Sequence, residues 1–231
     1  MSDLPAEGRI DIHSHLLPDL DDGCRSADEA LAIIEILMDA GFVGSVCTPH
    51  LWPEQWPDYT PAFVADRVAE LSDAVHKAGL DYHLWTGGEL RISPGVLPWI
   101  QEVGIPTLGE GRCVLIDHWG AAWPEEGDAL IDFLFDRGCQ PILAHPERLG
   151  FTHDDMAVAA GRLRDRGVWF QGNLNCLAGG EGDEAAMWIR RWLREGRYDL
   201  IATDAHRPRA MDGRLEGLAL LEIEVGPEKR S

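Results

Sequence analysis

Short apolar segments alternate with amphipathic stretches along this 231-residue chain, and this alternation limits the possible fold more than any other feature. Each apolar segment is five residues long, which suits a strand buried on both faces of a parallel sheet. The repeated pattern of seven βα units predicts an α/β fold, a TIM-like barrel or near-barrel, and leaves an open doubly wound sheet as the alternative. The predicted strands are 9–13, 43–47, 82–86, 113–117, 140–144, 168–172 and 199–203.

The stretches between these strands carry helix start and stop signals. Ser26 with Glu29 three residues later forms a capping box, and Gly41 suits the position just after that helix. Thr60 followed by Pro61 marks the start of a second helix, which runs to about residue 79. We expect one domain over 1–231, with a core at about 9–209 and an acidic tail after about 213. Further helices are predicted near 94–103, 126–137, 154–166 and 185–195.

Charge and cysteine usage exclude several classes of protein. The chain has 20 basic and 40 acidic side chains, so its net charge of −20 repels nucleic acid and anionic lipid. The five cysteines are odd in number and widely spaced, which favours reduced thiols over a disulfide framework. No apolar run is long enough to span a membrane, and no signal peptide is recognisable at the start. We therefore expect a cytoplasmic protein without membrane insertion.

Potential metal ligands follow almost every predicted strand. Taken singly, each is more often a capping or loop residue, but the carboxyl ends of parallel strands lie at one face of the sheet. Because the ligand types recur at that face, the sequence predicts a polynuclear metal site there. The candidates are His13, His15 and Asp22 after the first strand, His50 after the second, Glu89 after the third, Asp117 at the end of the fourth, His145 after the fifth, and Asp204 and His206 after the last.

The types of ligand narrow the choice of metal. Imidazoles and carboxylates without a well-placed thiolate suit first-row divalent ions, so we expect manganese first, with iron or zinc as alternatives. A single ion needs only three or four protein ligands, so this many candidates imply two or three ions. Two ions roughly 3.5–4 Å apart generate a hydroxide near neutral pH and hold the oxygens of an in-line displacement. This is the chemistry of phosphoester hydrolysis.

At these motifs the sequence resembles the PHP (polymerase and histidinol phosphatase) domain family. Within it, the chain is most similar to the bacterial metal-dependent protein-tyrosine phosphatases of capsule and exopolysaccharide synthesis. The resemblance covers roughly residues 9–209 and also implies a distorted seven-stranded barrel. The motifs that carry it, in chain order, are DIHSHLLPDLDDG, CTPH, GGELRI, AHPER, FQGNLNCLAGG and ATDAH.

The resemblance also implies how the ligands are shared among the ions. The family usually has Glu at the position of Asp117, whose side chain is shorter by one methylene. The second ion is then expected to shift, or His118 to substitute as a ligand. The implied sets are His13, His15, Glu89 and Asp204 for the first ion, Glu89, Asp117 and His145 for the second, and Asp22, His50 and His206 for the third.

Arginine supplies the other half of phosphate recognition, because its planar fork pairs with two phosphate oxygens. Arg148 is the first candidate, since it follows His145 by three residues and the resemblance places a phosphate-binding arginine there. Arg91 and Arg207 are further candidates, although each also suits a surface ion pair. We expect Arg148, Glu89 and His206 to take part in catalysis.

Aromatic residues are concentrated in two loops that leave the same face of the predicted sheet. They suit stacking on an aryl leaving group, and they equally suit packing within the loops or a contact between subunits. The sequence does not decide among these three roles, and it does not give the oligomeric state. The residues are Trp52, Trp56 and Tyr59 in one loop and Trp119 and Trp123 in the other.

These features predict a metal-dependent phosphomonoesterase, most simply a protein-tyrosine phosphatase that uses a metal-bridged hydroxide. The expected substrate is a phosphotyrosine protein, with a tyrosine autokinase as one candidate, or a small phosphomonoester. The alternatives are a small-metabolite phosphatase, such as one for histidinol phosphate, and a non-catalytic metal-binding regulatory module. A thiol-based phosphatase is excluded because no cysteine has an arginine six residues later, and no GxSxG nucleophile elbow occurs.

Overall fold

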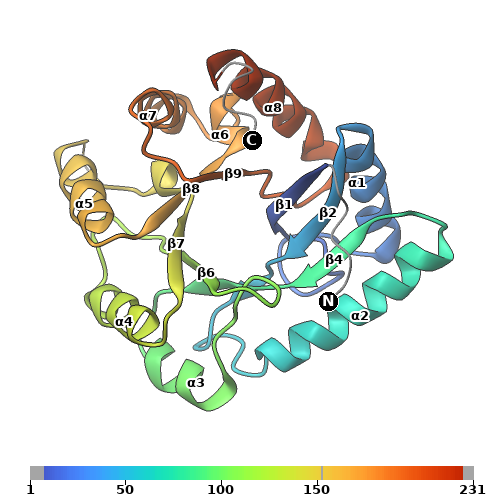
Figure 1. Ribbon diagram of the computed structural model, residues 1–231, viewed down its shortest axis with the longest axis horizontal. Coiled ribbons are helices and arrows are strands. Elements are labelled where there is room, and N and C mark those ends of the chain that lie inside the picture. Colours follow the sequence, from blue (N-terminus) through green and yellow to red (C-terminus); the bar gives the residue numbers. More distant parts are fainter. Residues whose placement is uncertain (1–7, 152, 226–231) are drawn as a thin grey trace.

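Parallel strands lie at the centre of the protein and helices surround them in the computed structural model, which describes residues 8–151 and 153–225 (Figure 1). All seven predicted strands are confirmed within one or two residues at each end. Two more strands, β3 and β5, are very short. The strands are β1 (Arg9–Ser14), β2 (Phe42–Cys47), β3 (His50–Leu51), β4 (His83–Thr86), β5 (Glu89–Arg91), β6 (Cys113–Asp117), β7 (Gln140–Ala144), β8 (Trp169–Asn173) and β9 (Leu200–Ala202).

Every strand pair between these elements is parallel, as the sequence predicts. The strands form two hydrogen-bonded sheets, one with the order β1-β2-β4 and one with the order β3-β5-β6-β7-β8-β9. A parallel bridge between Ser14 and Ala205 joins the end of β1 to the segment after β9. The backbone N–H of His15 donates to the carbonyl of Ala205 at 2.8 Å, and that of Asp204 donates to the carbonyl of His13 at 3.0 Å. Ligand candidates from the two ends of the chain are thereby brought together.

The predicted helices are also present, and they lie outside the strands (Figure 1). The Ser26 hydroxyl accepts from the backbone N–H of Glu29, and the Thr60 hydroxyl accepts from that of Phe63, which confirms both predicted N-caps. Gly41 has φ +83°, a conformation that favours glycine at a helix end. The helices are α1 (Ala27–Asp39), α2 (Pro61–Lys77), α3 (Val96–Val103), α4 (Glu125–Asp136), α5 (His153–Asp165), α6 (Leu174–Leu177), α7 (Asp183–Arg194) and α8 (Met211–Val225), with 3-10 turns at Pro146–Arg148 and Pro208–Ala210.

Strand β6 shows why the sheet residues are apolar on both faces. Val114 and Ile116 belong to the large cluster between the strands and the helices, whereas Leu115 belongs to a smaller cluster with Ile142 and Ala144. Neighbouring residues in a strand point to opposite faces, so both faces of β6 are buried in apolar surroundings. The continuous apolar pattern of the predicted strands therefore has its expected cause.

Helix α8 covers part of the segment after residue 213, where the sequence predicts an acidic tail and no helix. Its apolar residues are spread around the helix, so the sequence shows little helical periodicity there. The helix packs closely on α6 through Gly217, where an added Cβ would lie 2.0 Å from the carbonyl oxygen of Leu174. The absence of a side chain at position 217 is what permits this approach.

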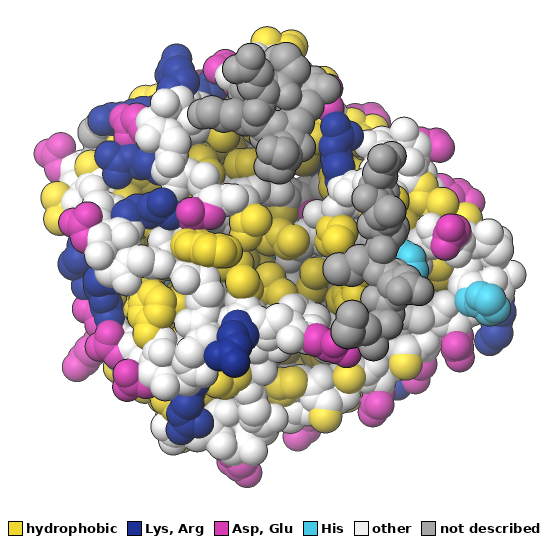
Figure 2. Space-filling view, viewed as in Figure 1, with side chains coloured by type: hydrophobic (Ala, Val, Ile, Leu, Met, Phe, Trp, Pro, Cys, Tyr) yellow, Lys and Arg dark blue, Asp and Glu magenta, His cyan; other side chains and the backbone are white. Residues whose placement is uncertain are grey.

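The surface carries the negative charge that the composition implies. Figure 2 shows acidic side chains scattered around the rim of one face, with hydrophobic side chains gathered nearer its centre. Among the described residues, no helix combines the length and the hydropathy needed to cross a membrane.

Candidate metal centre

The predicted ligands converge at the carboxyl ends of the strands. Nine residues fall into four overlapping groups of three or four whose nitrogen and oxygen atoms lie within 4.8 Å of one another. These are the nine residues predicted from the strand ends. The groups are His15, Asp22, His50 and His206; His13, Glu89 and His145; His13, His15 and Asp204; and His50, Glu89 and Asp117.

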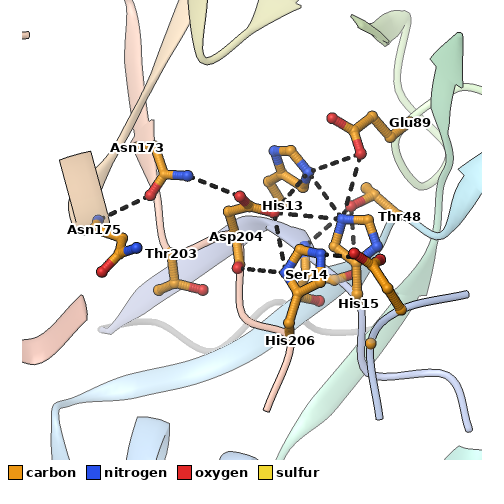
Figure 3. Close-up of polar contacts among 12 residues, drawn as sticks. His13, Ser14, His15, Thr48, Glu89, Asn173, Asn175, Thr203, Asp204 and His206 are labelled. Carbon is orange, nitrogen blue, oxygen red and sulfur yellow. Dashed lines mark hydrogen bonds and ion pairs between the residues drawn. The ribbon is translucent and has the colours of Figure 1, made fainter. Parts of the chain in front are cut away.

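Glu89 lies at the middle of this cluster and is fully buried. One carboxylate oxygen, Oε2, lies 2.8 Å from Nδ1 of His50, 3.4 Å from Nε2 of His13 and 3.3 Å from Nε2 of His15. The other oxygen, Oε1, lies 2.9 Å from Nε2 of His145. Figure 3 shows Glu89 facing the imidazoles of His13 and His15. Glu89 thus reaches four imidazoles, as a bridging carboxylate would.

The pairing of strands explains why Glu89 occupies that position. In the short ladder between β3 and β5, His50 is directly paired with Glu89. In the next ladder, Arg91 of β5 is paired with Asp117 of β6. Residues that are paired in parallel strands lie side by side, so β3 and β5 place His50 beside Glu89. Asp117 lies two residues beyond Leu115, the partner of Glu89 in β6, and therefore on the same face.

His13 and His15 face a second carboxylate, that of Asp204. Oδ1 of Asp204 lies 3.4 Å from Nε2 of each of these histidines (Figure 3). The two Nε2 atoms are themselves 3.2 Å apart. Their side chains share one face because they are separated by a single residue in the extended chain. Two imidazoles and a carboxylate therefore converge on one point.

The third predicted set lies at the open side of the cluster. Oδ1 of Asp22 is 3.4 Å from Nε2 of His50 and 3.3 Å from Nε2 of His206. The rings of His15 and His206 stack with centroids 3.9 Å apart. Asp22 is 70% exposed, whereas His50 and His206 are mostly buried. Any ion held by this set would be the one nearest to solvent.

Asp117 reaches the cluster despite its shorter side chain. Its Oδ1 lies 3.8 Å from Nδ1 of His145, and Asp117 shares a group with His50 and Glu89. His118, the alternative ligand, belongs to none of the groups found among the described residues. Its Nε2 lies 2.7 Å from the carbonyl oxygen of Ala122 instead. The geometry therefore favours Asp117 over His118.

Three buried oxygen atoms indicate that the cluster fits cations. Oε2 of Glu89 and both oxygens of Asp117 are buried without a hydrogen-bond partner. Buried polar atoms are rarely left in this way, because desolvation without a partner is costly. The nitrogens of His13, His15 and His50 lie 2.8–3.4 Å from Oε2 of Glu89 without making a hydrogen bond to it, as ligand atoms around a shared ion do. The donor set thus suits first-row divalent metals.

Electrostatics keep the central carboxylates charged. Burial by itself would raise the pKa of Glu89, but the imidazoles of His13 and His50 hold that pKa well below its usual range. The pKa of Asp204 is also well below its usual range, because the effect of His13 and His206 outweighs the effect of burial. Asp117 differs, since burial and the neighbouring Glu89 carboxylate both raise its pKa. A cation between Glu89 and Asp117 would relieve that repulsion.

Backbone strain accompanies two of the candidate ligands. His145 has φ +28° and Asp204 has φ +51°, values that residues other than glycine seldom adopt. Such conformations cost free energy and are concentrated at functional sites. In both cases the chain turns sharply at the carboxyl end of a strand and aims the side chain into the cluster.

Polar residues behind the cluster orient the ligands, and the sequence analysis did not assign them. Oε1 of Gln171 accepts from Nδ1 of His13 at 2.9 Å, and Oδ2 of Asp21 accepts from Nδ1 of His15 at 2.7 Å. Each contact leaves Nε2 free to face the cluster. Asn173 donates to Oδ2 of Asp204 at 2.7 Å (Figure 3). A buried glutamine within an otherwise apolar strand was the signal available for Gln171.

The three candidate arginines occupy different surroundings. Arg148 lines the cleft above the cluster, and its Nη1 donates to Oδ2 of Asp204 at 3.0 Å. Arg91 lies against the rings of Trp52 and Trp119 instead. Arg207 donates to the carbonyl of Asp22 at 3.1 Å. Arg207 therefore lies beside the cluster, and Arg148 is the best placed of the three for a bound phosphate.

A cleft with a volume of about 560 Å³ gives access to these groups. Ligand candidates form its floor, and Arg148 and the loop after β6 form its walls. The cleft is large enough for a phosphate ester with a side chain attached. The residues lining it are Asp22, His50, Glu89, His118, Trp119, Gly120, Ala121, His145, Arg148, Gly150, Asp204 and His206.

The fold and this site define a parallel α/β protein with a candidate polynuclear metal centre at the carboxyl ends of its strands. Residues 9–224 match the family model for capsular polysaccharide synthesis, CpsB/CapC. The chain belongs to that family, which confirms the resemblance read from its motifs.

Similar proteins and a similar solved structure agree with this assignment. The tyrosine-protein phosphatase YwqE of Bacillus subtilis is 26% identical over 95% of this chain and 86% of its own length. The putative tyrosine-protein phosphatase CapC of Staphylococcus aureus is 27% identical over 85% of this chain and 76% of its own. A crystal structure from work on YwqE and on CpsB of Streptococcus pneumoniae, metal-dependent tyrosine phosphatases, superposes with a TM-score of 0.84. It is 26% identical and covers 95% of this chain and 89% of the other.

Replacing the central carboxylate should remove more metal than replacing a peripheral imidazole. In Glu89→Gln the side chain keeps its size but loses the charge that faces four imidazoles, whereas His50→Gln changes one ring at the open side. After dialysis against a weak chelator, elemental analysis should find less metal per chain in Glu89→Gln than in His50→Gln. Wild-type metal content in Glu89→Gln, with an unchanged circular dichroism spectrum, would show that Glu89 is not a shared ligand.

Proposed function

We propose that this chain is a metal-dependent protein-tyrosine phosphatase. The observation that carries the proposal is the cluster of imidazoles and carboxylates around Glu89, open to a cleft that Arg148 lines. The named activity of the CpsB, CapC and YwqE relatives supports this function over that of a small-metabolite phosphatase. The family's link to capsular polysaccharide synthesis supports the same role here.

Divalent ions held by the imidazoles and carboxylates around Glu89 would lower the pKa of a bound water molecule and neutralise charge on the phosphoryl oxygens. The chain's own residues then have distinct tasks. Glu89 is proposed to bridge ions, Asp204 and His206 to be terminal ligands, and Gln171 and Asp21 to fix the ring orientation of His13 and His15.

Arg148 is proposed to bind the phosphate. Asp204 holds one end of its guanidinium at 3.0 Å, and a carboxylate oxygen of Glu181 lies 3.8 Å from its Nε. The charges of Asp204 and Glu181 outweigh burial and raise the pKa of Arg148, so it stays cationic. A cation fixed before the reaction stabilises charge that shifts among the phosphoryl oxygens in the transition state.

A thiol nucleophile has no support among the described cysteines. None of the five cysteines is among the described residues that line the cleft. Burial also raises the pKa of Cys24 to about 12 and raises the pKa of Cys176, the thiol next to Arg148, so these two thiols are not ionised at neutral pH. Thiolates rather than thiols attack phosphorus, so direct attack by water is the mechanism that these surroundings favour.

The proposal extends to finer features of the protein. Manganese is the first choice of ion because the ligands are nitrogen and oxygen atoms. We further propose a single PHP-type domain, with its two sheets arranged as a distorted seven-stranded barrel, and a cytoplasmic location, which its free cysteines suit. The proposed substrate is a phosphotyrosine protein, with a tyrosine autokinase as one candidate.

Hydrolysis of matched substrates tests the function. Purified protein with added Mn²⁺ should hydrolyse a phosphotyrosine peptide and p-nitrophenyl phosphate, and a chelator should abolish both reactions. The kcat/KM for the phosphotyrosine peptide should exceed the values for histidinol phosphate and for the same peptide with phosphoserine. A preference for histidinol phosphate would assign the small-metabolite function instead, and no hydrolysis with manganese, iron or zinc would refute a phosphatase.

Removal of the Arg148 side chain tests its role in phosphate recognition. Arg148→Ala should keep the bound metal but lower kcat/KM for p-nitrophenyl phosphate by on the order of 10²-fold, because one preorganised donor is lost. Arg148→Lys should recover part of the loss, since an ammonium restores charge without the planar fork. Arg137→Ala, at the exposed end of α4, is the matched control.

Two results would contradict this mechanism. One is an Arg148→Ala variant as active as the wild type. The other is a covalent phosphoenzyme trapped by acid quenching after incubation with labelled substrate, because attack by water leaves no phosphate on the protein.

A further inference from the structure

A stacked set of aromatic and cationic side chains stands beside the metal cluster. The guanidinium of Arg91, at the end of β5, lies 4.0 Å from the ring centroid of Trp119 and 4.8 Å from that of Trp52. The two indoles meet edge to face with centroids 5.9 Å apart. Nη1 of Arg91 is buried without a hydrogen-bond partner, and the guanidinium lies over the two indole rings.

Trp119 is the member of this set that reaches the cleft. It is 52% exposed and lines the cleft together with Arg148. Its ring meets that of His50 edge to face at 5.2 Å. Among the described residues that line the cleft, it is the one aromatic side chain besides histidine. An exposed indole beside a phosphate-sized site suits an aromatic ligand.

The other aromatic residues of this region contact one another. Trp56 and Tyr59 stack at 5.5 Å, and Trp52 meets Trp56 edge to face at 6.2 Å. Through these contacts the aromatic side chains of the loop after β3 pack against one another. They leave Trp119, on the loop after β6, as the ring presented to the cleft.

The loop that carries Trp119 folds back on itself in a tight turn. Nε2 of His118 lies 2.7 Å from the carbonyl oxygen of Ala122, which closes the turn. A Cβ at Gly120 would lie 2.4 Å from that same nitrogen, so only glycine fits there without a shift. A ring already fixed in place loses little conformational freedom when a ligand stacks on it.

We propose that Trp119, braced by Arg91, stacks on the aromatic ring of an aryl phosphomonoester and thereby selects aryl over alkyl phosphates. The proposal rests on the phosphatase function and names the residue that gives it specificity. Arg91 acts as a positioning residue through the ring of Trp119. With the phosphate at Arg148 and the metal cluster, the aryl group would extend along the wall of the cleft that Trp119 forms.

Binding of two phosphonates separates ring recognition from phosphate recognition. Phenylphosphonate carries an aromatic ring and methylphosphonate does not, and neither is hydrolysed. For Trp119→Ala, the inhibition constant of phenylphosphonate should rise by on the order of tenfold, the effect of one lost aromatic pair. The constant for methylphosphonate should stay within about twofold, and Trp119→Phe should behave like the wild type. Calorimetric titration gives the same comparison without turnover.

Trp169 provides the matched control. It is an exposed tryptophan at the amino end of β8, so Trp169→Ala removes an indole away from the cleft. Equal changes for both phosphonates in Trp119→Ala, or no change for either, would overturn the proposal. Failure of the wild type to hydrolyse any phosphate ester would instead refute the function, and the two failures are therefore distinct.

A double-mutant cycle tests whether Arg91 acts through Trp119. Arg91→Met should weaken phenylphosphonate binding in the wild-type background and have little further effect in Trp119→Ala. Direct binding of phosphate by Arg91 predicts something different, namely equal weakening of methylphosphonate and phenylphosphonate in both backgrounds. That result would assign Arg91 to the phosphate and remove it from the proposal.

Discussion

The carboxylate of Glu89, buried among four imidazoles, is the interaction on which the rest of the site depends. A buried carboxylate is costly unless positive charge surrounds it, and one of its oxygens has no hydrogen-bond partner. The same residue links the inner ligands, His13 and His145, to the outer one, His50. A change at Glu89 therefore affects two of the four ligand groups and removes the charge that faces all four imidazoles, whereas a change at exposed Asp22 affects one group.

The fold brings these imidazoles and carboxylates together because all its paired strands run in the same direction. Their carboxyl ends meet at one face, so ligands from residue 13 to residue 206 converge although they are far apart in the sequence. The bridge between Ser14 and Ala205 holds the first and last strands together. Positive φ angles at His145 and Asp204 then turn two side chains inward. Strain and buried charge are thus concentrated where the chemistry is proposed to occur.

Sequence patterns predicted most of the strands, the helix caps and the nine candidate ligands. Strands β3 and β5 escaped prediction because two or three residues show no periodicity, yet their ladder places His50 beside Glu89. Helix α8 was missed because its apolar residues lie all around it and its packing depends on Gly217. The partners of Gln171 and Arg91 depend on contacts between distant segments, which residue spacing does not reveal.

Anomalous diffraction from crystals grown with Mn²⁺ would show whether ions share Glu89, because it locates each ion without relying on activity. Two or three peaks are expected at the manganese edge, at least one pair of them roughly 3.5–4 Å apart, as in two-metal hydrolases. A carboxylate oxygen of Glu89 should lie within bonding distance of two of them. A single peak, or peaks that Glu89 does not touch, would contradict a polynuclear centre built around this residue.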